Sequence, residues 1–276
     1  MFSKIKKDSL LINVQKPRII LIGGSNLSFG INSSKIQEAL NYNVINTAIH
    51  AGLGLKYMLD SNLSFVKEND IVVVIPEYQH FYGRQFYGSN ELLRICADLG
   101  YGDLKLLDKK QIKNIEPFIL KYSFSKFSPL EYLNVKKSVI YDADSFNEFG
   151  DAVAHWGMET TSFSPSKKME GDFNNEVINY LKQFEKKLVD KKAYFFLSFP
   201  GLQEISFENN KEQIAFIEGK IKDESFKILG TAKRYKMLQE YMFNTPYHLN
   251  KKGVDYRTKL FIEDLRRINV TQNLNE

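Results

Sequence analysis

The stretch RIILIGGSN, residues 18–26, joins a continuous apolar run to a Gly-Gly turn. An apolar run that ends at Ile22 is typical of a strand buried on both faces of a parallel sheet. Ser25 follows the turn directly. The pattern therefore places Ser25 at the carboxyl end of a strand, where the ligand sites of open α/β sheets lie.

Strands and helices alternate on both sides of a long middle segment. Alternation of this kind predicts a parallel sheet with right-handed crossovers. The apolar spacing predicts strands over 18–22, 44–46, 71–75, 193–199 and 226–229, and helices over 33–41, 55–66, 177–188, 207–222 and 253–267, with Ser34 and Gln37 at capping-box spacing.

We therefore expect an α/β fold: a three-layer sandwich with a five-stranded parallel sheet, flavodoxin-like in appearance. The segment 79–172 interrupts the alternation, is rich in Tyr, Phe, Asn and Gly, and has short helical periods. We expect one domain over residues 1–276, with 79–172 inserted as a cap over the carboxyl edge of the sheet. Tyr78, Tyr82 and Trp156 are its expected pocket lining.

The charge balance favours no large acidic polymer as partner. The 276 residues include 38 basic and 33 acidic side chains, for a net charge of +5, and the two signs are interspersed. Interspersed charges are typical of solvated faces, and the chain has no nucleic-acid-binding motif. We expect no nucleic-acid partner, although a basic groove for an acidic polymer stays open as the alternative.

Cysteine and histidine usage argues against metal and redox chemistry. Cys96 is the single cysteine, which excludes an internal disulfide, and the four histidines are not at ligand spacing. We expect neither a metal nor a cofactor. The chain has no apolar run of about 18 residues and no signal-peptide core near Met1, so we expect no membrane span and a cytoplasmic location. Association with the cell envelope is the alternative if an anchor has been removed.

The Gly-Gly-Ser turn is a candidate nucleophile site. Backbone N–H groups at a turn and a helix start can face a developing oxyanion. A serine is a weak nucleophile and needs a base within hydrogen-bond reach. These residues alone support two interpretations equally well. Ser25 is a nucleophile, or the Gly-Gly-Ser segment only turns the chain and Ser25 caps a helix.

The candidate base is His248, in the segment NTPYHLN at residues 244–250. This segment follows the last expected strand and precedes the last expected helix, so it also lies on the carboxyl side of the sheet. The other histidines are His50, His80 and His155. We expect the side chains of Ser25 and His248 to approach within hydrogen-bond reach.

Three blocks of the chain resemble those of the SGNH (GDSL-like) hydrolases. They are ILIGGSN at 20–26 with FGI at 29–31, NTAIHAGLG at 46–54, and YHLN at 247–250 with Gly253, Arg257 and Thr258. The resemblance implies a serine-dependent esterase or acyltransferase, with Ser25 as nucleophile, His248 as base, and the N–H groups of Ser25 and Gly52 as the oxyanion hole. It is strongest to members that modify bacterial surface polysaccharides, which implies O-acyl groups, such as acetyl, on a carbohydrate as substrate. Hydrolysis and transfer both stay open.

Three departures from the family pattern leave a second interpretation open. Gly24 stands where the family has an aspartate, and the third block reads PEYQ at 76–79, with Gln79 in place of an asparagine. Asn244 and Thr245 stand where an aspartate precedes the histidine, so Asn244 is the expected partner of the imidazole. The alternative is a catalytically inactive carbohydrate-binding or polysaccharide-assembly protein of the same fold.

Two further segments are candidate substrate-binding sites. Glu77 and Tyr78 follow the strand over 71–75, and a helix-start carboxylate is the alternative role for Glu77. Asp151 and His155 lie near Trp156, a combination that suits a sugar ring. A surface loop with a buried tryptophan is the alternative there.

Overall fold

The computed structural model describes residues 2–99, 101–127, 140 and 143–268. Among these residues, five parallel strands form one sheet in the order β2-β1-β3-β4-β6. This confirms the expected five-stranded parallel sheet. The strands are β1 (Arg18–Gly23), β2 (Asn43–Asn46), β3 (Ile71–Ile75), β4 (Tyr194–Ser198) and β6 (Ile228–Leu229).

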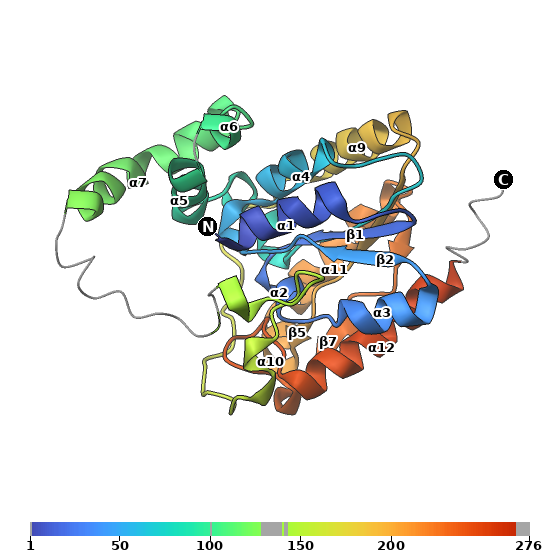
Figure 1. The fold of residues 1–276 in the computed structure, drawn as a ribbon. Helices are drawn as coiled ribbons and strands as arrows, with labels where there is room; N and C mark the ends of the chain where they lie inside the picture. Colours follow the sequence, from blue (N-terminus) through green and yellow to red (C-terminus); the bar gives the residue numbers. More distant parts are fainter. Residues whose placement is uncertain (1, 100, 128–139, 141–142, 269–276) are drawn as a thin grey trace.

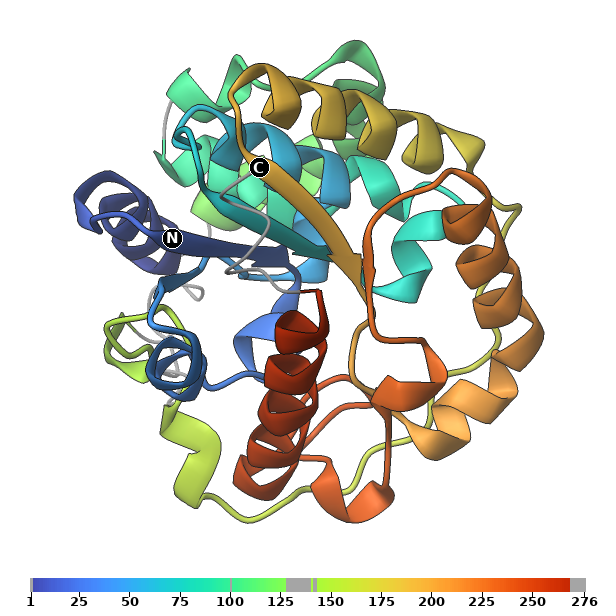
Figure 2. The same cartoon turned by 90° about the vertical axis from the view of Figure 1, so that its right-hand side faces the viewer.

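Helices cover both faces of the sheet, as a three-layer sandwich requires. Figures 1 and 2 show α1, α4 and α9 on one face and α3 and α12 on the other. Each helix turns apolar residues toward strands that are buried on both faces. The helices are α1 (Phe2–Asn13), α3 (Ser33–Leu40), α4 (Leu55–Leu63), α9 (Asn175–Asp190) and α12 (Lys251–Arg267).

The strand order creates a topological switch point beside β1. The chain leaves β1 for β2 on one side and then returns to β3 on the other side. Gly23 pairs in register with Ile75, so the two strands end level with each other. In open α/β sheets, ligands bind in the crevice outside such a pair of carboxyl ends. The segments that begin at Gly24 and Glu77 lie at this position.

A buried ion pair fixes the opposite, amino end of β1. Arg18 and Asp70 are both fully buried, and Arg18 Nε donates to Asp70 Oδ1 at 2.9 Å. Arg18 Nη1 also donates to Leu11 O of α1 at 2.7 Å. The pair therefore joins the start of β1 to the residue before β3 and to α1, and removing one partner would leave an uncompensated buried charge.

Some local expectations were wrong. Asn32, not Ser34, caps α3, and its side chain accepts from Lys35 N at 3.3 Å. The helix expected over 207–222 is two helices, α10 (Glu204–Asn209) and α11 (Lys211–Asp223). The break lies at Asn210, whose Nδ2 donates back to Ser206 O at 2.9 Å, a bond that competes with helix continuation.

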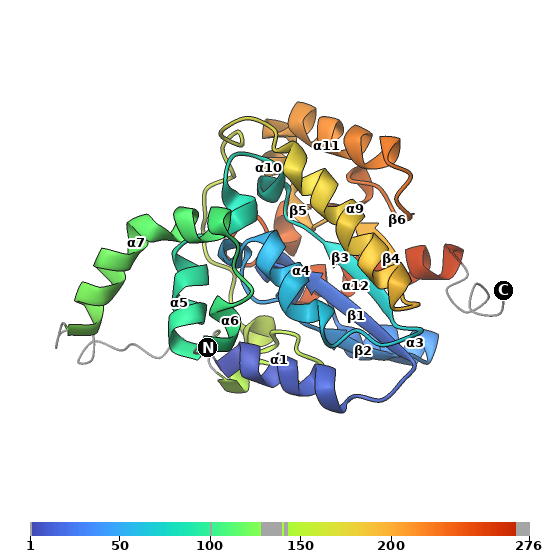
Figure 3. The same ribbon diagram turned by 90° about the horizontal axis from the view of Figure 1, so that it is seen from above.

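The segment expected as an insertion contains more regular structure than its sequence predicted. Its 19-residue helix α7 contradicts the expectation of short helical periods only. Figure 3 shows α5 and α7 at the side of the sheet body. Residues 100, 128–139 and 141–142 of this segment lie outside the described residues. The elements are η2 (Tyr78–Phe81), η3 (Gln85–Tyr87), α5 (Asn90–Leu99), α6 (Tyr101–Leu104), α7 (Lys109–Phe127), η4 (Ala143–Ser145) and η5 (Ala154–Gly157).

A second, two-stranded parallel sheet lies outside the main one. It pairs β5 (Leu202–Gln203) with β7 (Lys236–Met237). The shorter elements are α2 (Ser25–Ser28), η1 (Ala51–Leu53), η6 (Lys233–Tyr235) and η7 (Gln239–Tyr241). Within the described ranges, no helix combines the length and apolarity needed to cross a bilayer.

Candidate functional site

Ser25 begins the short helix α2 immediately after the turn that ends β1. Its side chain is almost buried, and within the described part of the chain neither its amide nor its hydroxyl bonds another protein group. A Cβ on Gly24 would stand 2.6 Å from Glu77 Oε1 and 3.0 Å from Ala51 Cα. Glycine therefore lets Glu77 and the loop after β2 approach the serine turn closely.

Asn26 links the serine turn to two buried charged groups. Its backbone N–H and its Nδ2 each donate to Glu77 Oε1 at 3.2 Å. Arg257 Nη1 donates to Asn26 O at 2.8 Å, and Arg257 Nη2 donates to Asn26 Oδ1 at 3.2 Å. Burial raises the pKa of Glu77, while the two Asn26 bonds and Arg257 act to lower it. The turn is held from both sides, which fixes the direction of the neighbouring Ser25.

The candidate base has the partner that the sequence predicts. His248 Nδ1 and Asn244 Oδ1 are 2.9 Å apart. Since an amide oxygen only accepts, Nδ1 is the protonated nitrogen and Nε2 keeps its lone pair. The expectation that Asn244 lies at the imidazole Nδ1 is confirmed.

His248 lies close to the helix that carries Ser25. Its ring stacks on Phe29, with the ring centroids 4.3 Å apart and the planes 10° apart. Phe29 N–H donates to Ser25 O at 2.9 Å, one turn along the chain. Residues four apart on a helical turn share a face. In the described part of the chain no hydrogen bond joins Ser25 Oγ to His248, so their direct contact stays a prediction.

The imidazole of His248 is held neutral. Burial lowers its pKa to about 3, and nearby His155 and His50 act in the same direction. No carboxylate among these causes opposes the shift. The imidazole is therefore in the form that accepts a proton, but it is a weak base.

The two N–H groups expected to form the oxyanion hole differ in whether they already have a hydrogen-bond partner. The Ser25 N–H is free of protein partners within the described residues. The Gly52 N–H instead donates to His50 Nδ1 at 2.9 Å, because His50 caps the short helix η1. Gly52 can donate to an oxyanion only after the His50 imidazole releases that N–H. The assignment of Gly52 to the oxyanion hole stays a prediction.

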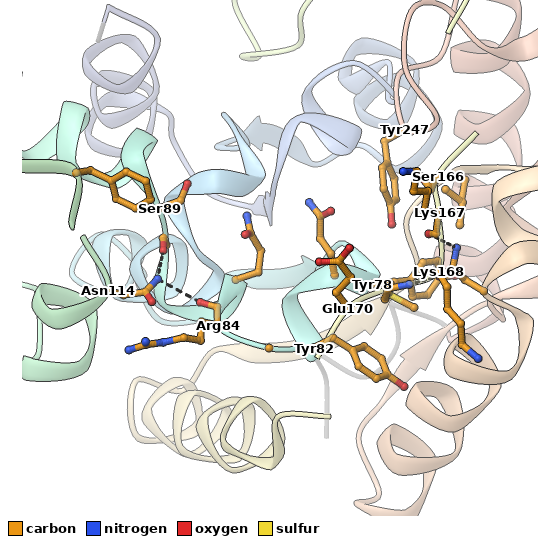
Figure 4. A pocket seen from close by; sticks show the side chains of 18 of the residues that line it. Tyr78, Tyr82, Arg84, Ser89, Asn114, Ser166, Lys167, Lys168, Glu170 and Tyr247 are labelled. Carbon is orange, nitrogen blue, oxygen red and sulfur yellow. Dashed lines mark hydrogen bonds between the residues drawn. The ribbon is translucent and has the colours of Figure 1, made fainter. Parts of the chain in front are cut away.

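A cavity of about 660 Å³ lies beside this group of residues (Figure 4). Tyr247, which precedes His248, forms part of its wall. Gln79 also lines it and donates to Glu77 Oε2 at 3.1 Å, while Ser89 lines it and donates to Gly52 O at 3.0 Å. Ser25 and His248 are not among the lining residues. The cavity thus adjoins three segments that hold the serine turn, the base and the Gly52 loop.

Glu77 and Tyr78, predicted as substrate-binding residues, take different positions. Tyr78 lines the cavity, whereas Glu77 is buried beneath it on the Asn26 amide. Burial and the nearby Glu77 carboxylate raise the pKa of Tyr247 well above its ordinary value. The segment expected as an insertion also supplies cavity residues, including Tyr82, as predicted for the pocket wall.

Asp151 and His155 do not line the cavity. Asp151 is fully buried and accepts from Ser33 N and Ser33 Oγ, each at 2.7 Å, and from Asn46 Nδ2 at 2.8 Å. These bonds fasten its loop to α3 and β2. Trp156 is also absent from the cavity wall, and Lys251 Nζ lies 4.8 Å from the centre of its ring. Both polar groups of this segment have structural partners, and we do not include them in the site.

His155 is instead a buried neutral histidine that couples stability to pH. Its Nε2 lies 2.9 Å from Leu249 O and must donate, while Nδ1 is buried without a partner in the described residues. Burial lowers the pKa of His155 to about 4. In the unfolded chain a histidine titrates near pH 6.5, so the unfolded state takes up the proton first. The contribution of neutral His155 to the free energy of unfolding is therefore complete above about pH 6.5 and is lost as the pH falls toward 4.

We expect His155→Gln to flatten the dependence of stability on pH. Glutamine can keep an N–H for Leu249 O but does not titrate. The slope of the unfolding free energy between pH 6.5 and 4 should fall by up to about 1.4 kcal/mol per pH unit. Urea unfolding at pH 7.5, 5.5 and 4.5 measures it. Parallel wild-type and variant curves would show that His155 does not contribute this dependence.

The described residues contain no group of three His, Cys, Asp or Glu side chains placed to hold a metal ion. The chemistry available at this edge of the sheet is that of a serine hydroxyl, a neutral imidazole with an amide partner, and backbone N–H donors. Comparison of the chain with protein-family models and with curated proteins gives no match.

Proposed function

We propose that the protein is an SGNH-type serine esterase or acyltransferase that acts on O-acyl groups of a carbohydrate. The observation that carries the proposal is the bond between His248 Nδ1 and Asn244 Oδ1, on an imidazole stacked against Phe29. Two features support this role for His248: its Nε2 has no hydrogen-bond partner among the described residues, and its ring contacts the turn that carries Ser25 at the switch point of the sheet. The resemblance of the three sequence blocks supports the same assignment.

In the proposed reaction, Ser25 Oγ attacks the acyl carbonyl carbon while His248 Nε2 takes the hydroxyl proton. The carbonyl oxygen becomes an oxyanion that the Ser25 N–H stabilises. The C–O bond to the sugar then breaks, and the sugar oxygen takes the proton from His248. The acyl-serine is cleaved by water in hydrolysis, or by a second sugar hydroxyl in transfer. These steps use only side chains and backbone of this chain.

A non-catalytic carbohydrate-binding protein is the second candidate function. Two observations favour it: Asn244 supplies no charge to an imidazolium, and the Gly52 N–H is occupied by His50. In this reading the serine turn is a structural remnant and the cavity is the functional feature. The two proposals differ in whether Ser25 is reactive.

Covalent labelling distinguishes them. We expect a fluorophosphonate probe to add to the peptide that contains Ser25, with parallel release of p-nitrophenol from p-nitrophenyl acetate. Ser25→Ala should abolish the label. Ser28→Ala is the matched control, because Ser28 is a buried serine of the same short helix and should not affect labelling. Absence of label and of ester hydrolysis on the wild-type protein would favour the binding protein.

A further inference from the structure

We propose that the cavity beside the serine turn binds an acidic oligosaccharide, whose carboxylate or phosphate groups contact a rim of basic side chains. This names the substrate class of the proposed function and rests on that function only for the fate of the acyl group. Binding itself can be tested without catalysis.

The charged residues that line the cavity are strongly unbalanced. Four are basic, Arg84, Lys113, Lys167 and Lys168, and one is acidic, Glu170. The whole chain has 38 basic and 33 acidic residues, close to an even ratio. The cavity therefore concentrates positive charge that the rest of the surface balances. A cleft lined by one sign of charge attracts ligands of the opposite sign.

Most of these basic side chains form no ion pair with any described residue. Arg84, Lys113 and Lys167 form no ion pair within the part of the chain that the structure describes. Lys168 meets only Glu212, at 4.0 Å, with both side chains largely in solvent. Some exposed lysines elsewhere pair with acids, as Lys182 does with Glu224 at 2.6 Å, whereas others, such as Lys186, form no ion pair among the described residues. The unpaired groups at the cavity remain free to contact an anionic ligand.

The basic groups stand on opposite sides of the cavity. Figure 4 shows Arg84 on one side with Ser89 and Asn114, and Lys167 on the other with Tyr247. Arg84 and Lys113 come from the region of η3 and α7, whereas Lys167 and Lys168 precede α9. Three segments distant in sequence thus bring charge to one space. A ligand with one anionic group would reach only one side, whereas an oligomer with several would reach both.

The remaining lining suits sugar rings. The half-buried Tyr247 offers an aromatic face and Tyr82 a smaller one, whereas Tyr78 is almost fully buried; Ser89 and Asn114 offer polar groups for hydroxyls. A volume of about 660 Å³ is within the roughly 300–1,000 Å³ typical of cavities that enclose drug-sized ligands. The space is larger than a single acetyl group needs. We infer that the carbohydrate part of the substrate, rather than its acyl group, occupies this cavity.

Isothermal titration calorimetry with unacylated tetrasaccharides tests the proposal. Tetragalacturonate supplies carboxylates, a mannotetraose capped with mannose 6-phosphate supplies phosphate, and cellotetraose is neutral. We expect one or both acidic ligands to bind at least tenfold more tightly than cellotetraose, and to weaken as NaCl is raised from 50 to 500 mM. The Ser25→Ala variant should bind equally well, so this result is independent of whether Ser25 is a nucleophile.

Matched variants locate the binding. Arg84→Gln, Lys113→Gln and Lys167→Gln combined should weaken binding of the preferred acidic ligand by about tenfold or more. Glu170→Gln should strengthen it. The control combines three exposed lysines outside the cavity lining, as Lys186→Gln, Lys211→Gln and Lys259→Gln, with the same change in net charge.

The outcomes separate the two proposals. Equal affinity for acidic and neutral ligands, no binding of either, or an equal loss in the control variant would each overturn the acidic-glycan inference. Ser25 labelling would still support the esterase in those cases. Charge-selective binding without Ser25 labelling would support the acidic-glycan inference and would contradict the esterase proposal.

Discussion

Asn244→Asp is expected to raise kcat for ester hydrolysis by up to about 10⁴-fold. In serine triads, the reverse change from aspartate to asparagine costs about that factor. Asn244 Oδ1 already lies 2.9 Å from His248 Nδ1, so a carboxylate would need no backbone movement to reach the imidazole. The charge would stabilise the imidazolium that forms when Ser25 loses its proton.

The same substitution should move the acid limb of the pH–rate profile. In the wild-type protein burial lowers the pKa of His248 to about 3, so the imidazole stays unprotonated to strongly acidic pH. A carboxylate partner favours the protonated form and raises that pKa. As the pH is lowered, kcat/KM of the variant should begin to fall at a higher pH than kcat/KM of the wild type. This limb reports the pKa of His248 in the free enzyme.

Asn244→Ala is the control for this effect, because it removes the amide without adding charge. It should be slower than the wild type, since nothing then selects the Nδ1–H tautomer. Rates from pH 4 to 9 for the three proteins measure both effects. An Asn244→Asp variant that is no faster, with an unmoved acid limb, would mean that another residue orients His248.

The sheet and its site edge were predictable because their signals are local. The buried strands β1 and β3 are uninterrupted apolar runs, a pattern that neither a surface helix nor an exposed strand shows. The alternation of strands and helices was then enough to predict that the Gly-Gly turn before Ser25 and the polar segment around His248 lie on the carboxyl side of the sheet. The partner of His248 was expected only from the resemblance to the SGNH pattern, which has an aspartate three or four residues before the histidine, where Thr245 and Asn244 stand.

Other elements carried no such signal. The two-residue strands β5 and β7 pair only because tertiary structure brings Leu202 and Lys236 together. Helix α1 has weak amphipathicity, and its buried Lys7 donates to Gly150 O at 2.8 Å, a contact across 143 residues. His50 and Gly52 are only two residues apart, but the hydrogen bond between them forms in one rotamer of the His50 side chain, which the sequence does not specify. The basic side chains of the cavity come from three segments that are distant in the sequence. Because basic and acidic residues are interspersed along the chain, the sequence does not indicate that these side chains meet.

Glu77 brings a carboxylate close to the turn that carries Ser25. The chain lacks the aspartate before Ser25, and Glu77 Oε1 lies 2.6 Å from where a Cβ on Gly24 would stand. A carboxylate therefore reaches this turn from the segment that follows β3. The same Glu77 accepts from Asn26 and Gln79, in the block that lacks the usual asparagine. Arg257 completes the arrangement from α12, and only the folded structure joins these positions.

Ser25→Ala is expected to have an effect that depends on residue 244. In a serine protease with a catalytic triad, loss of the nucleophile or the base costs about 10⁶-fold in kcat, and loss of the acid alone costs about 10⁴-fold. These losses are not additive, because the residues act as a unit. A protein that already lacks the carboxylate has only about 10²-fold left to lose. We therefore expect Ser25→Ala to lower kcat by about 10²-fold in the wild type and by about 10⁶-fold in the Asn244→Asp background.

Measuring kcat for the wild type, both single variants and the double variant closes this cycle. Ser28→Ala in each background is the control for changes to α2 that leave the nucleophile intact, and it should change kcat little. A Ser25→Ala effect that is equally large in both backgrounds would mean that the carboxylate acts on a step without Ser25. An effect that grows by about 10⁴-fold ties Ser25, His248 and residue 244 to one proton transfer, because only a group that shares the transition state can couple so strongly.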